Sequence, residues 1–218
     1  MSRIKTRSGD ALVVVDAQVG AIGRCWQAPR VVEAIADLVA RARLAGTPVV
    51  WVRDEGLVTG SPDWQIVAEL IPDPGEVVVE KRWPDSFAET TLEDVLADAG
   101  ADHLWLVGAQ SDFCVRSTLF GGLHRGYDVT LVEDAHTTVA AGLEGQQVPA
   151  ELLVALVNRL AWTTRMPGVT SQLCRAADVD FAPAHQLDDE DLLEAVEADE
   201  QAEEDADDVA LGLADPEP

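Results

Sequence analysis

Five short runs of β-branched and other apolar residues, separated by segments with helical spacing, constrain the fold of this chain most strongly. The first run, ALVVVDA at residues 11–17, is apolar until its aspartate, as expected for a strand buried on both faces of a sheet. The other runs cover residues 47–53, 76–82, 103–109 and 127–135. Strands that alternate with helices are joined by right-handed crossovers, so the pattern predicts a parallel sheet covered by helices on both faces. Residues 169–173 are too weakly patterned to assign.

The segments between these runs carry the apolar stripes and end signals of helices. Apolar residues recur at helical spacing over residues 31–42, and Gly46 is placed to end that helix. Thr90 and Glu93 have the spacing of a capping box, which predicts a helix start at Thr90. Ser111 is expected to cap the helix that follows the fourth strand.

The charge of the chain is distributed unevenly. The sequence has 15 Lys and Arg against 40 Asp and Glu, a formal net charge of −25. Residues 188–218 contain no Lys or Arg and no aromatic residue, so they cannot bury enough apolar surface to fold alone. We therefore predict one hydrolase-sized domain over residues 1–187 and an acidic, disordered tail over 188–218, with at most a short helix at 189–198. The tail is expected to act as a solubilising segment.

The composition also excludes several classes of partner and location. A chain this acidic has no basic face for nucleic acid or an anionic membrane. There is no run of 18 apolar residues, and the N-terminus is polar, so neither a membrane span nor a secretory signal is expected. Cys25, Cys114 and Cys174 are too few and too scattered for a disulfide framework. The expected location is the reducing cytoplasm.

Reactive side chains stand where three of the predicted strands end. Asp16 ends the first strand, Lys81 ends the third, and Cys114 follows the fourth after a tight turn. Taken singly, each has an ordinary explanation as a turn residue, a solvated charge or a small buried thiol. Because ligands bind outside the carboxyl ends of parallel strands, we expect the three groups to meet in one site.

These three groups together have the chemistry of a covalent hydrolase. The thiolate is the nucleophilic form of cysteine, and a position in the first turn of a helix favours an anion at Cys114. The Lys81 ammonium is expected to lower the pKa of the thiol further, and Asp16 to accept its proton and return it to a leaving amine. Backbone N–H groups in the turn from Gln110 to Cys114 would form an oxyanion hole. This chemistry predicts acyl transfer from a small amide or ester.

Four further residues lie within a few positions of the proposed site and are candidates for binding substrate: Gln18, Trp83, Phe113 and His136. Trp83 and Phe113 would supply an apolar wall, with Gln110 as an amide contact. Packing against the protein itself is an equally good interpretation of both aromatic side chains. For His136, capping of the turn after the fifth strand is favoured over contact with substrate.

Four stretches at these positions resemble the isochorismatase-like cysteine hydrolases: VVVDAQ, VVVEKRWPDSF, LVGAQSDFCVRST and GYDVTLVEDAHTT. The resemblance covers residues 10–175, and its most specific element is the pattern G-x-x-x-D-x-C-V. It implies a Rossmann-like parallel β-sheet flanked by helices on both faces. It maps the catalytic triad of the family onto Asp16, Lys81 and Cys114.

The same resemblance implies further features of the site and the assembly. Members carry a cis peptide bond that corresponds here to Ala109–Gln110, and it directs the amides of Gln110 and Cys114 at the oxyanion. Members also form homo-oligomers, so a dimer or tetramer is expected. Nicotinamidase members hold a divalent metal with an Asp-x-His…His cluster after the second strand, but this chain has WVRDEGLVTGSPDW there, without histidine. We therefore predict no metal and no cofactor.

The sequence thus predicts a metal-independent cysteine hydrolase that cleaves a small amide or carbamoyl C–N bond through a thioester. Isochorismatases that cleave a vinyl ether can lack the nucleophile, so the presence of Cys114 favours covalent hydrolysis. Two alternatives stay open: vinyl-ether hydrolysis with Asp16 as general acid, and a catalytically silent binding protein that uses its acidic tail. The identity of the small-molecule substrate depends on the loops at residues 54–75 and 136–148, which sequence patterns do not trace.

Overall fold

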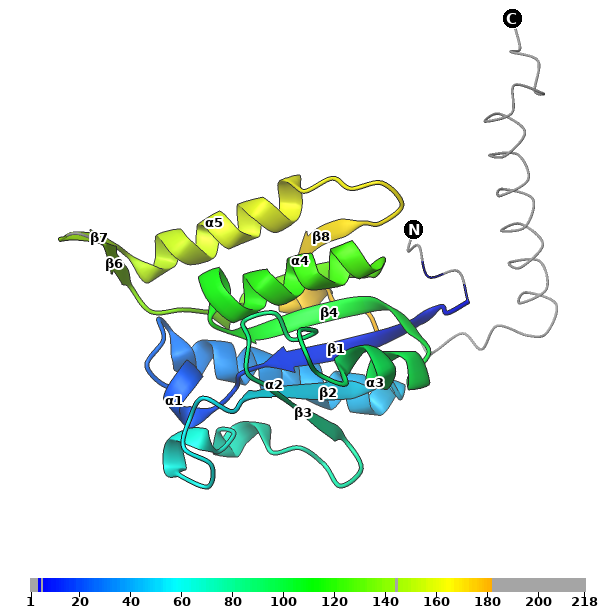
Figure 1. The fold of residues 1–218 in the computed structure, drawn as a ribbon, viewed down its shortest axis with the longest axis horizontal. Helices are drawn as coiled ribbons and strands as arrows, with labels where there is room; N and C mark the ends of the chain where they lie inside the picture. The colour runs from blue at the N-terminus through cyan, green and yellow to red at the C-terminus, as the bar shows by residue number, and fades with distance from the viewer. Residues whose placement is uncertain (1–3, 5, 144, 182–218) are drawn as a thin grey trace, which may run out of the picture.

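The computed structural model describes residues 4, 6–143 and 145–181, and its central feature is a six-stranded parallel sheet (Figure 1). The strand order is β3–β2–β1–β4–β5–β8. The bounds are β1 (Gly9–Val15), β2 (Val49–Asp54), β3 (Val77–Lys81), β4 (Ala101–Ala109), β5 (Asp128–Thr137) and β8 (Ser171–Cys174). The predicted tail at 188–218, with its helix at 189–198, lies outside the described residues.

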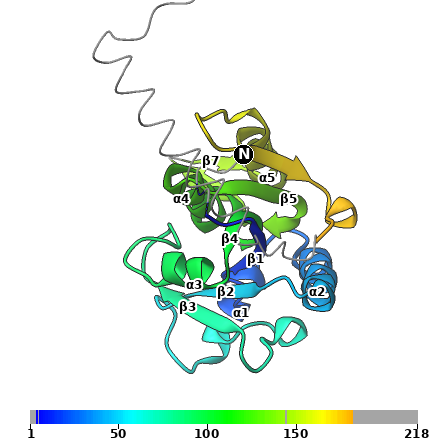
Figure 2. The ribbon, with the colours of Figure 1, turned by 90° about the vertical axis from the view of Figure 1, so that its right-hand side faces the viewer.

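Helices cover both faces of this sheet, which confirms the predicted fold class. Figure 2 shows α2 on the opposite side of the sheet from α3 and α4. The helices are α1 (Val19–Ile22), α2 (Ala28–Ala45), α3 (Leu92–Asp98), α4 (Arg116–Arg125) and α5 (Ala150–Thr163). The first strand is buried on both faces: Leu12 and Val14 pack in the core beneath α2, while Val13 and Val15 pack in the core beneath α3, α4 and α5.

Short elements complete the fold between these helices and strands. Single turns of 3₁₀ helix occur at Pro62–Trp64, Ala68–Leu70 and Ala176–Asp178. A two-stranded antiparallel hairpin, β6 (Ala141–Leu143) and β7 (Gln146–Val148), projects from the body beside α5 (Figure 1). A turn of π-helix at Ser111–Val115 leads into α4.

Helix ends agree with the sequence at Gly46 and differ at Thr90. Gly46 follows the last residue of α2, and its N–H donates to the carbonyl oxygens of Ala42 and Arg43. The capping box is wrong, because α3 begins at Leu92. The hydroxyl of Thr90 instead donates to the carbonyl oxygen of Ser86, at 2.6 Å.

Gly108 lies where β4 approaches β1 most closely. Its φ is +121°, and a Cβ atom there would stand 2.0 Å from the carbonyl oxygen of Val15. We expect Gly108→Ala to lower the free energy of unfolding by about 3 kcal/mol or more, since the substitution adds both a strained backbone and a backbone clash. Urea unfolding measures the loss. Gly46→Ala is the matched control, because its φ is +75° with nothing within 4 Å, and we expect it to cost about 1 kcal/mol. Equal losses in the two variants would contradict this account.

Candidate active site

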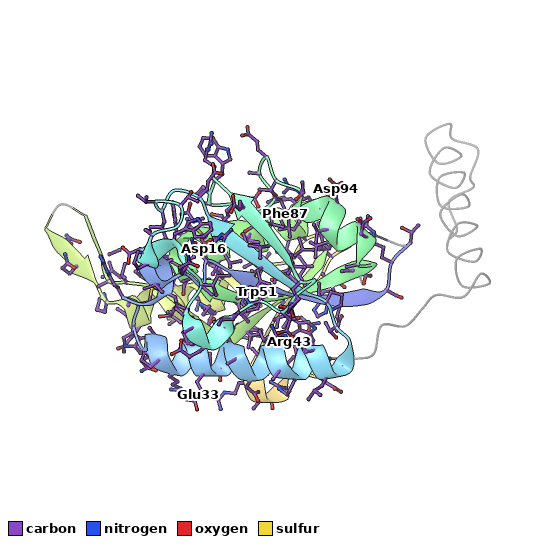
Figure 3. All side chains as sticks on the ribbon, turned by 90° about the horizontal axis from the view of Figure 1, so that it is seen from below. Asp16, Glu33, Arg43, Trp51, Phe87 and Asp94 are labelled. Atoms are coloured by element: carbon purple, nitrogen blue, oxygen red, sulfur yellow. The ribbon has the colours of Figure 1, made fainter. Side chains whose placement is uncertain are left out.

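Asp16, Lys81 and Cys114 meet at the carboxyl ends of the strands. Asp16 follows β1, Lys81 is the last residue of β3, and Cys114 lies in the π-helical turn before α4. Lys81 Nζ lies 2.8 Å from Asp16 Oδ2 and donates to Cys114 Sγ at 3.2 Å. Figure 3 labels Asp16 at the end of the sheet nearest the β6–β7 hairpin. Three groups from three separate strand–helix units are therefore within direct contact.

The trio is buried, and the backbone holds its carboxylate in place. Asp16 and Lys81 are each 2% exposed, and Cys114 is 5% exposed. The φ of Asp16 is +48°, and its N–H donates to the carbonyl oxygen of Val52 at 2.9 Å. Asp16 Oδ1 is buried, and within the described part of the chain it has no hydrogen-bond partner. A buried carboxylate oxygen without a partner is costly, and it is a suitable acceptor for a proton.

Burial dominates the electrostatics of the site. It raises the pKa of Asp16 from 3.8 to about 6, although the charge of Lys81 opposes the shift. For Cys114, burial and then the negative charge of Asp16 raise the pKa to about 12, against the effect of Lys81. Burial lowers the pKa of Lys81, but the charges of Asp16 and Cys114 outweigh it and hold that pKa above the ordinary value.

The expectation that Lys81 lowers the pKa of the Cys114 thiol is therefore wrong for the resting protein. Because Asp16 neutralises the effect of the ammonium and burial disfavours a sulfur anion, the group at neutral pH is a thiol. Cys25 and Cys174, also free, have pKa values raised to about 11 by burial. What distinguishes Cys114 is thus its two charged neighbours. A base that accepts the proton during attack is needed for nucleophilic chemistry at this sulfur.

The turn that carries Cys114 is wound more widely than an α-helix. The peptide bond Ala109–Gln110 is cis, and the N–H groups of Phe113 and Val115 both donate to the carbonyl oxygen of Gln110, at 3.1 Å each. The predicted capping role of Ser111 is wrong: its hydroxyl lies 2.7 Å from His136 Nδ1.

The four candidate substrate residues fall into two groups. Trp83 and Phe113 are 48% and 53% exposed, on the surface near the site. Gln18 is buried and connects two loops: its Nε2 donates to the carbonyl oxygens of Asp54 and Trp64, and its Oε1 accepts from the Asp54 N–H. His136 is buried too, between Ser111 and Asn158. The structure thus leaves the aromatic pair available to a ligand and engages Gln18 and His136 within the protein.

Sequence reasoning missed the contacts behind the Cys114 turn. Asn158, on α5, has its Oδ1 2.7 Å from His136 Nε2, and the Thr138 hydroxyl donates to Asp112 Oδ1 at 2.5 Å. The stretch EDAHTT does mark the end of β5, but nothing in the spacing connects it to a helix twenty residues later. Among the described residues, no group of three or more His, Cys, Asp or Glu side chains is arranged to hold a metal ion. The helices of this part of the chain are likewise too short or too polar to cross a membrane.

Comparison with known proteins agrees with this site. An Isochorismatase domain model matches residues 10–164. A streptothricin hydrolase of Streptomyces noursei is 38% identical over 141 residues, which are 61% of this chain and 56% of that protein. The chain spans about half the length of the curated relatives it matches.

Solved structures share the whole arrangement of the sheet and helices. An isochorismatase from Pseudomonas putida has a TM-score of 0.69 and 28% identity, covering 78% of this chain and 90% of that one. An N-carbamoylsarcosine amidase from Thermoplasma acidophilum has a TM-score of 0.61 and 26% identity, covering 79% and 99%. The family model, the fold and the strand-end trio lead to the same conclusion: this chain belongs to the isochorismatase family.

Proposed function

We propose that this protein is a metal-independent cysteine hydrolase that cleaves the C–N bond of a small amide or carbamoyl compound through a thioester at Cys114. The observation that carries the proposal is the buried contact set of Lys81 Nζ, 2.8 Å from Asp16 and 3.2 Å from Cys114 Sγ. Related proteins named streptothricin hydrolase and N-carbamoylsarcosine amidase support a hydrolase of this kind.

In the acylation step, Cys114 Sγ attacks the acyl carbon while its proton moves to Asp16. A carboxylate with a pKa near 6 is well matched to this role at neutral pH. The C–S bond forms as the carbonyl π electrons move to oxygen, where the amides of Gln110 and Cys114 would hold the oxyanion. The Lys81 ammonium stabilises negative charge on the sulfur. When the tetrahedral intermediate collapses, the C–N bond breaks and Asp16 returns the proton to the leaving nitrogen.

In the second step, water attacks the thioester carbonyl and gives a proton to Asp16. The C–S bond then breaks, the acid product leaves, and the proton returns to the sulfur. Asp16 thus carries one proton in each direction per step, and Lys81 remains charged throughout. Trp83 and Phe113 would line the entrance for the apolar part of a small substrate. We further propose a homo-oligomer that works in a reducing compartment such as the cytoplasm, in keeping with three free cysteines.

Trapping of the thioester tests the proposal. The protein is mixed with a panel of simple amides, carbamoyl compounds, activated esters and vinyl ethers, quenched in acid, and weighed intact by mass spectrometry. We expect one acyl group per chain, mapped by peptide analysis to Cys114, with Cys25 and Cys174 unmodified. Turnover of a vinyl ether without any acylated protein would instead support the isochorismatase alternative. Turnover of an amide with acylation at another cysteine would contradict the role of Cys114.

The pH dependence of kcat/KM is a separate prediction. Because Asp16 must be ionised to accept the thiol proton and its pKa is about 6, kcat/KM should rise tenfold per pH unit below that value and level off above it. The raised pKa of Lys81 keeps the plateau level into the alkaline range. Asp102→Asn is the matched control, since burial raises the pKa of Asp102 to about 6 as well, at the start of β4, the end of that strand away from the site. Loss of the inflection in that variant would assign it to the wrong carboxyl group.

A further inference from the structure

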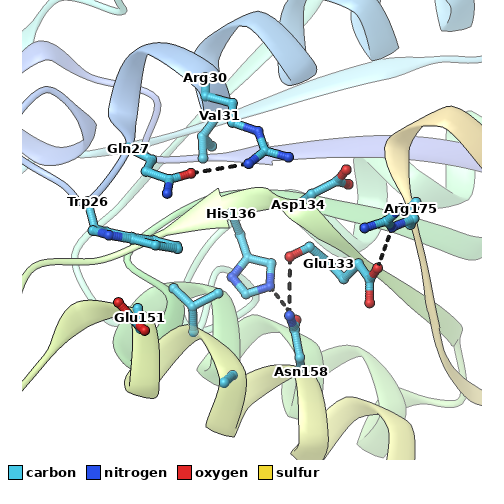
Figure 4. Close-up of a pocket in the computed structure, with 12 residues that line it drawn as sticks. Trp26, Gln27, Arg30, Val31, Glu133, Asp134, His136, Glu151, Asn158 and Arg175 are labelled. Atoms are coloured by element: carbon cyan, nitrogen blue, oxygen red, sulfur yellow. Dashed lines mark hydrogen bonds and ion pairs between the residues drawn. The ribbon is translucent and has the colours of Figure 1, made fainter.

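A chain of hydrogen bonds runs from the Cys114 turn to the far side of β5 (Figure 4). Ser111 Oγ lies 2.7 Å from His136 Nδ1, and His136 Nε2 lies 2.7 Å from Asn158 Oδ1. Asn158 Nδ2 donates to the carbonyl oxygen of Glu133 at 3.2 Å. His136 itself is 1% exposed. Both nitrogens of its ring are therefore engaged by the protein, and substrate has no free atom of the ring to bind.

The contacts of Asn158 settle where the imidazole proton lies. The amide nitrogen of Asn158 is committed to the carbonyl of Glu133, so the atom that faces His136 is the acceptor Oδ1. His136 Nε2 must then carry the hydrogen, and Nδ1 must accept from the Ser111 hydroxyl. Complete burial lowers the pKa of His136 to about 4, so the ring is neutral under ordinary conditions and this arrangement persists.

The hydroxyl that His136 holds belongs to the turn on which the nucleophile sits. Ser111 lies between Gln110 and Cys114, whose amides the proposed mechanism uses. A second side-chain bond, from the Thr138 hydroxyl to Asp112 Oδ1, connects the same turn to the chain just after β5. The turn is thus fastened at two consecutive residues to the end of β5.

We propose that His136 is a positioning residue, which fixes the Ser111–Val115 turn so that its amides meet the oxyanion, and not a substrate-binding residue. This inference rests on the proposed function. Displacement of a catalytic group by about 1 Å costs about 100-fold in rate, so a loosened turn should lower kcat strongly. Since His136 does not touch substrate, KM should change little.

Two nearly isosteric substitutions separate the two nitrogens of the ring. In His136→Asn the side-chain oxygen can stand near the position of Nδ1 and accept from Ser111. In His136→Gln the side-chain nitrogen can stand near Nε2 and donate to Asn158, but nothing accepts from Ser111. If the bond to Ser111 positions the turn, His136→Gln should lose about 100-fold in kcat and His136→Asn no more than about tenfold. Ser111→Ala, which removes the hydroxyl without adding bulk, should match His136→Gln.

The probe for these variants is p-nitrophenyl acetate, read as the Cys114-dependent burst of nitrophenolate and the steady rate that follows. The Ser111→Ala, His136→Gln double variant should be no slower than either single variant, because both remove the same bond. His124→Gln, on the exposed surface of α4, is the matched control and should be unaffected. Melting temperatures identify any variant that fails to fold, in which case Ser111→Ala carries the test.

A cavity beside His136 allows a rescue experiment. This cavity has a volume of about 390 Å³, is bordered by His136 and Asn158, and has Trp26, Arg30 and Glu151 at its edge (Figure 4). In His136→Gly, added imidazole can enter through it and restore an acceptor for Ser111, so the burst rate should recover at least tenfold. Added imidazole should not rescue the combined Ser111→Ala, His136→Gly variant.

The outcomes distinguish this inference from the proposed function. An unchanged kcat in His136→Gln and Ser111→Ala, alongside a burst that Cys114→Ala abolishes, would overturn the positioning role alone. A rise in KM at constant kcat would return His136 to substrate binding and equally overturn it. A burst that persists in Cys114→Ala would overturn the proposed function itself.

Discussion

Replacement of Cys114 by alanine is expected to lower kcat at least about 10⁴-fold, to a level set by whatever binding and oxyanion stabilisation the site retains. The reason is that no other nucleophile is present among Asp16 and Lys81, which hold and move the proton but cannot form the acyl intermediate in its place. Steady-state kinetics on the substrate found in the panel, together with intact mass after an acid quench, measure the loss. Both turnover and the acylated protein should disappear.

Cys25→Ala is the matched control for this variant. Cys25 is also a buried free thiol, with a pKa raised to about 11, but its Sγ contacts only the carbonyl oxygen of Ala21 among the hydrogen-bond partners described, and no lysine approaches it. We expect Cys25→Ala to keep its kcat within about threefold, because it removes a similar volume far from the charged pair. If Cys114→Ala retained turnover, water would have to be the direct nucleophile, and Asp16 acting as general acid on a vinyl ether would become the better description.

The parts of this structure that the sequence predicts are those set by local pattern and by topology. Residues 11–15 are uniformly apolar, so they could only be a strand buried on both faces, and residues 12 and 14 do pack on one side while 13 and 15 pack on the other. Because parallel strands end at one edge, Asp16, Lys81 and Cys114 could be placed together without any knowledge of the helices. Their contact follows from strand order alone.

The parts that the sequence does not predict depend on partners distant along the chain. The strand β8 (Ser171–Cys174) is only half-buried at the edge of the sheet, so it lacks the apolar signature of a central strand. Ser111 fits a capping pattern, but a histidine 25 residues later offers a better hydrogen bond. The pKa of Cys114 is also a property of burial, and a strand-end position alone does not say how deeply the sulfur is covered.

Lys81→Met should both inactivate and destabilise the protein. Methionine fills a similar volume but leaves Asp16 without its only ion-pair partner among the described residues, 2% exposed to solvent. Removal of one member of a buried pair costs about 3–5 kcal/mol. With Lys81 gone, burial acts on Asp16 unopposed, so the pKa of its carboxyl rises above the value of about 6 that it has in the intact site. A protonated Asp16 cannot accept the thiol proton, and we expect kcat at pH 7 to fall about 10³-fold.

The pH dependence of the unfolding free energy identifies the cause of this loss. A carboxyl group whose pKa is higher in the folded state than its unfolded 3.8 binds more protons when folded, so its stabilising effect is complete below pH 3.8 and disappears as the pH rises through the folded value. Lys81→Met should therefore approach the native protein in stability near pH 4 and fall progressively behind it towards pH 8. In the Asp16→Asn, Lys81→Met double variant no charge is buried, so this slope should vanish and stability at pH 8 should recover, while activity stays lost. Urea unfolding at each pH measures both effects. A single variant whose deficit is the same at pH 4 and pH 8 would mean that Lys81 supports the fold by packing and that Asp16 does not depend on it.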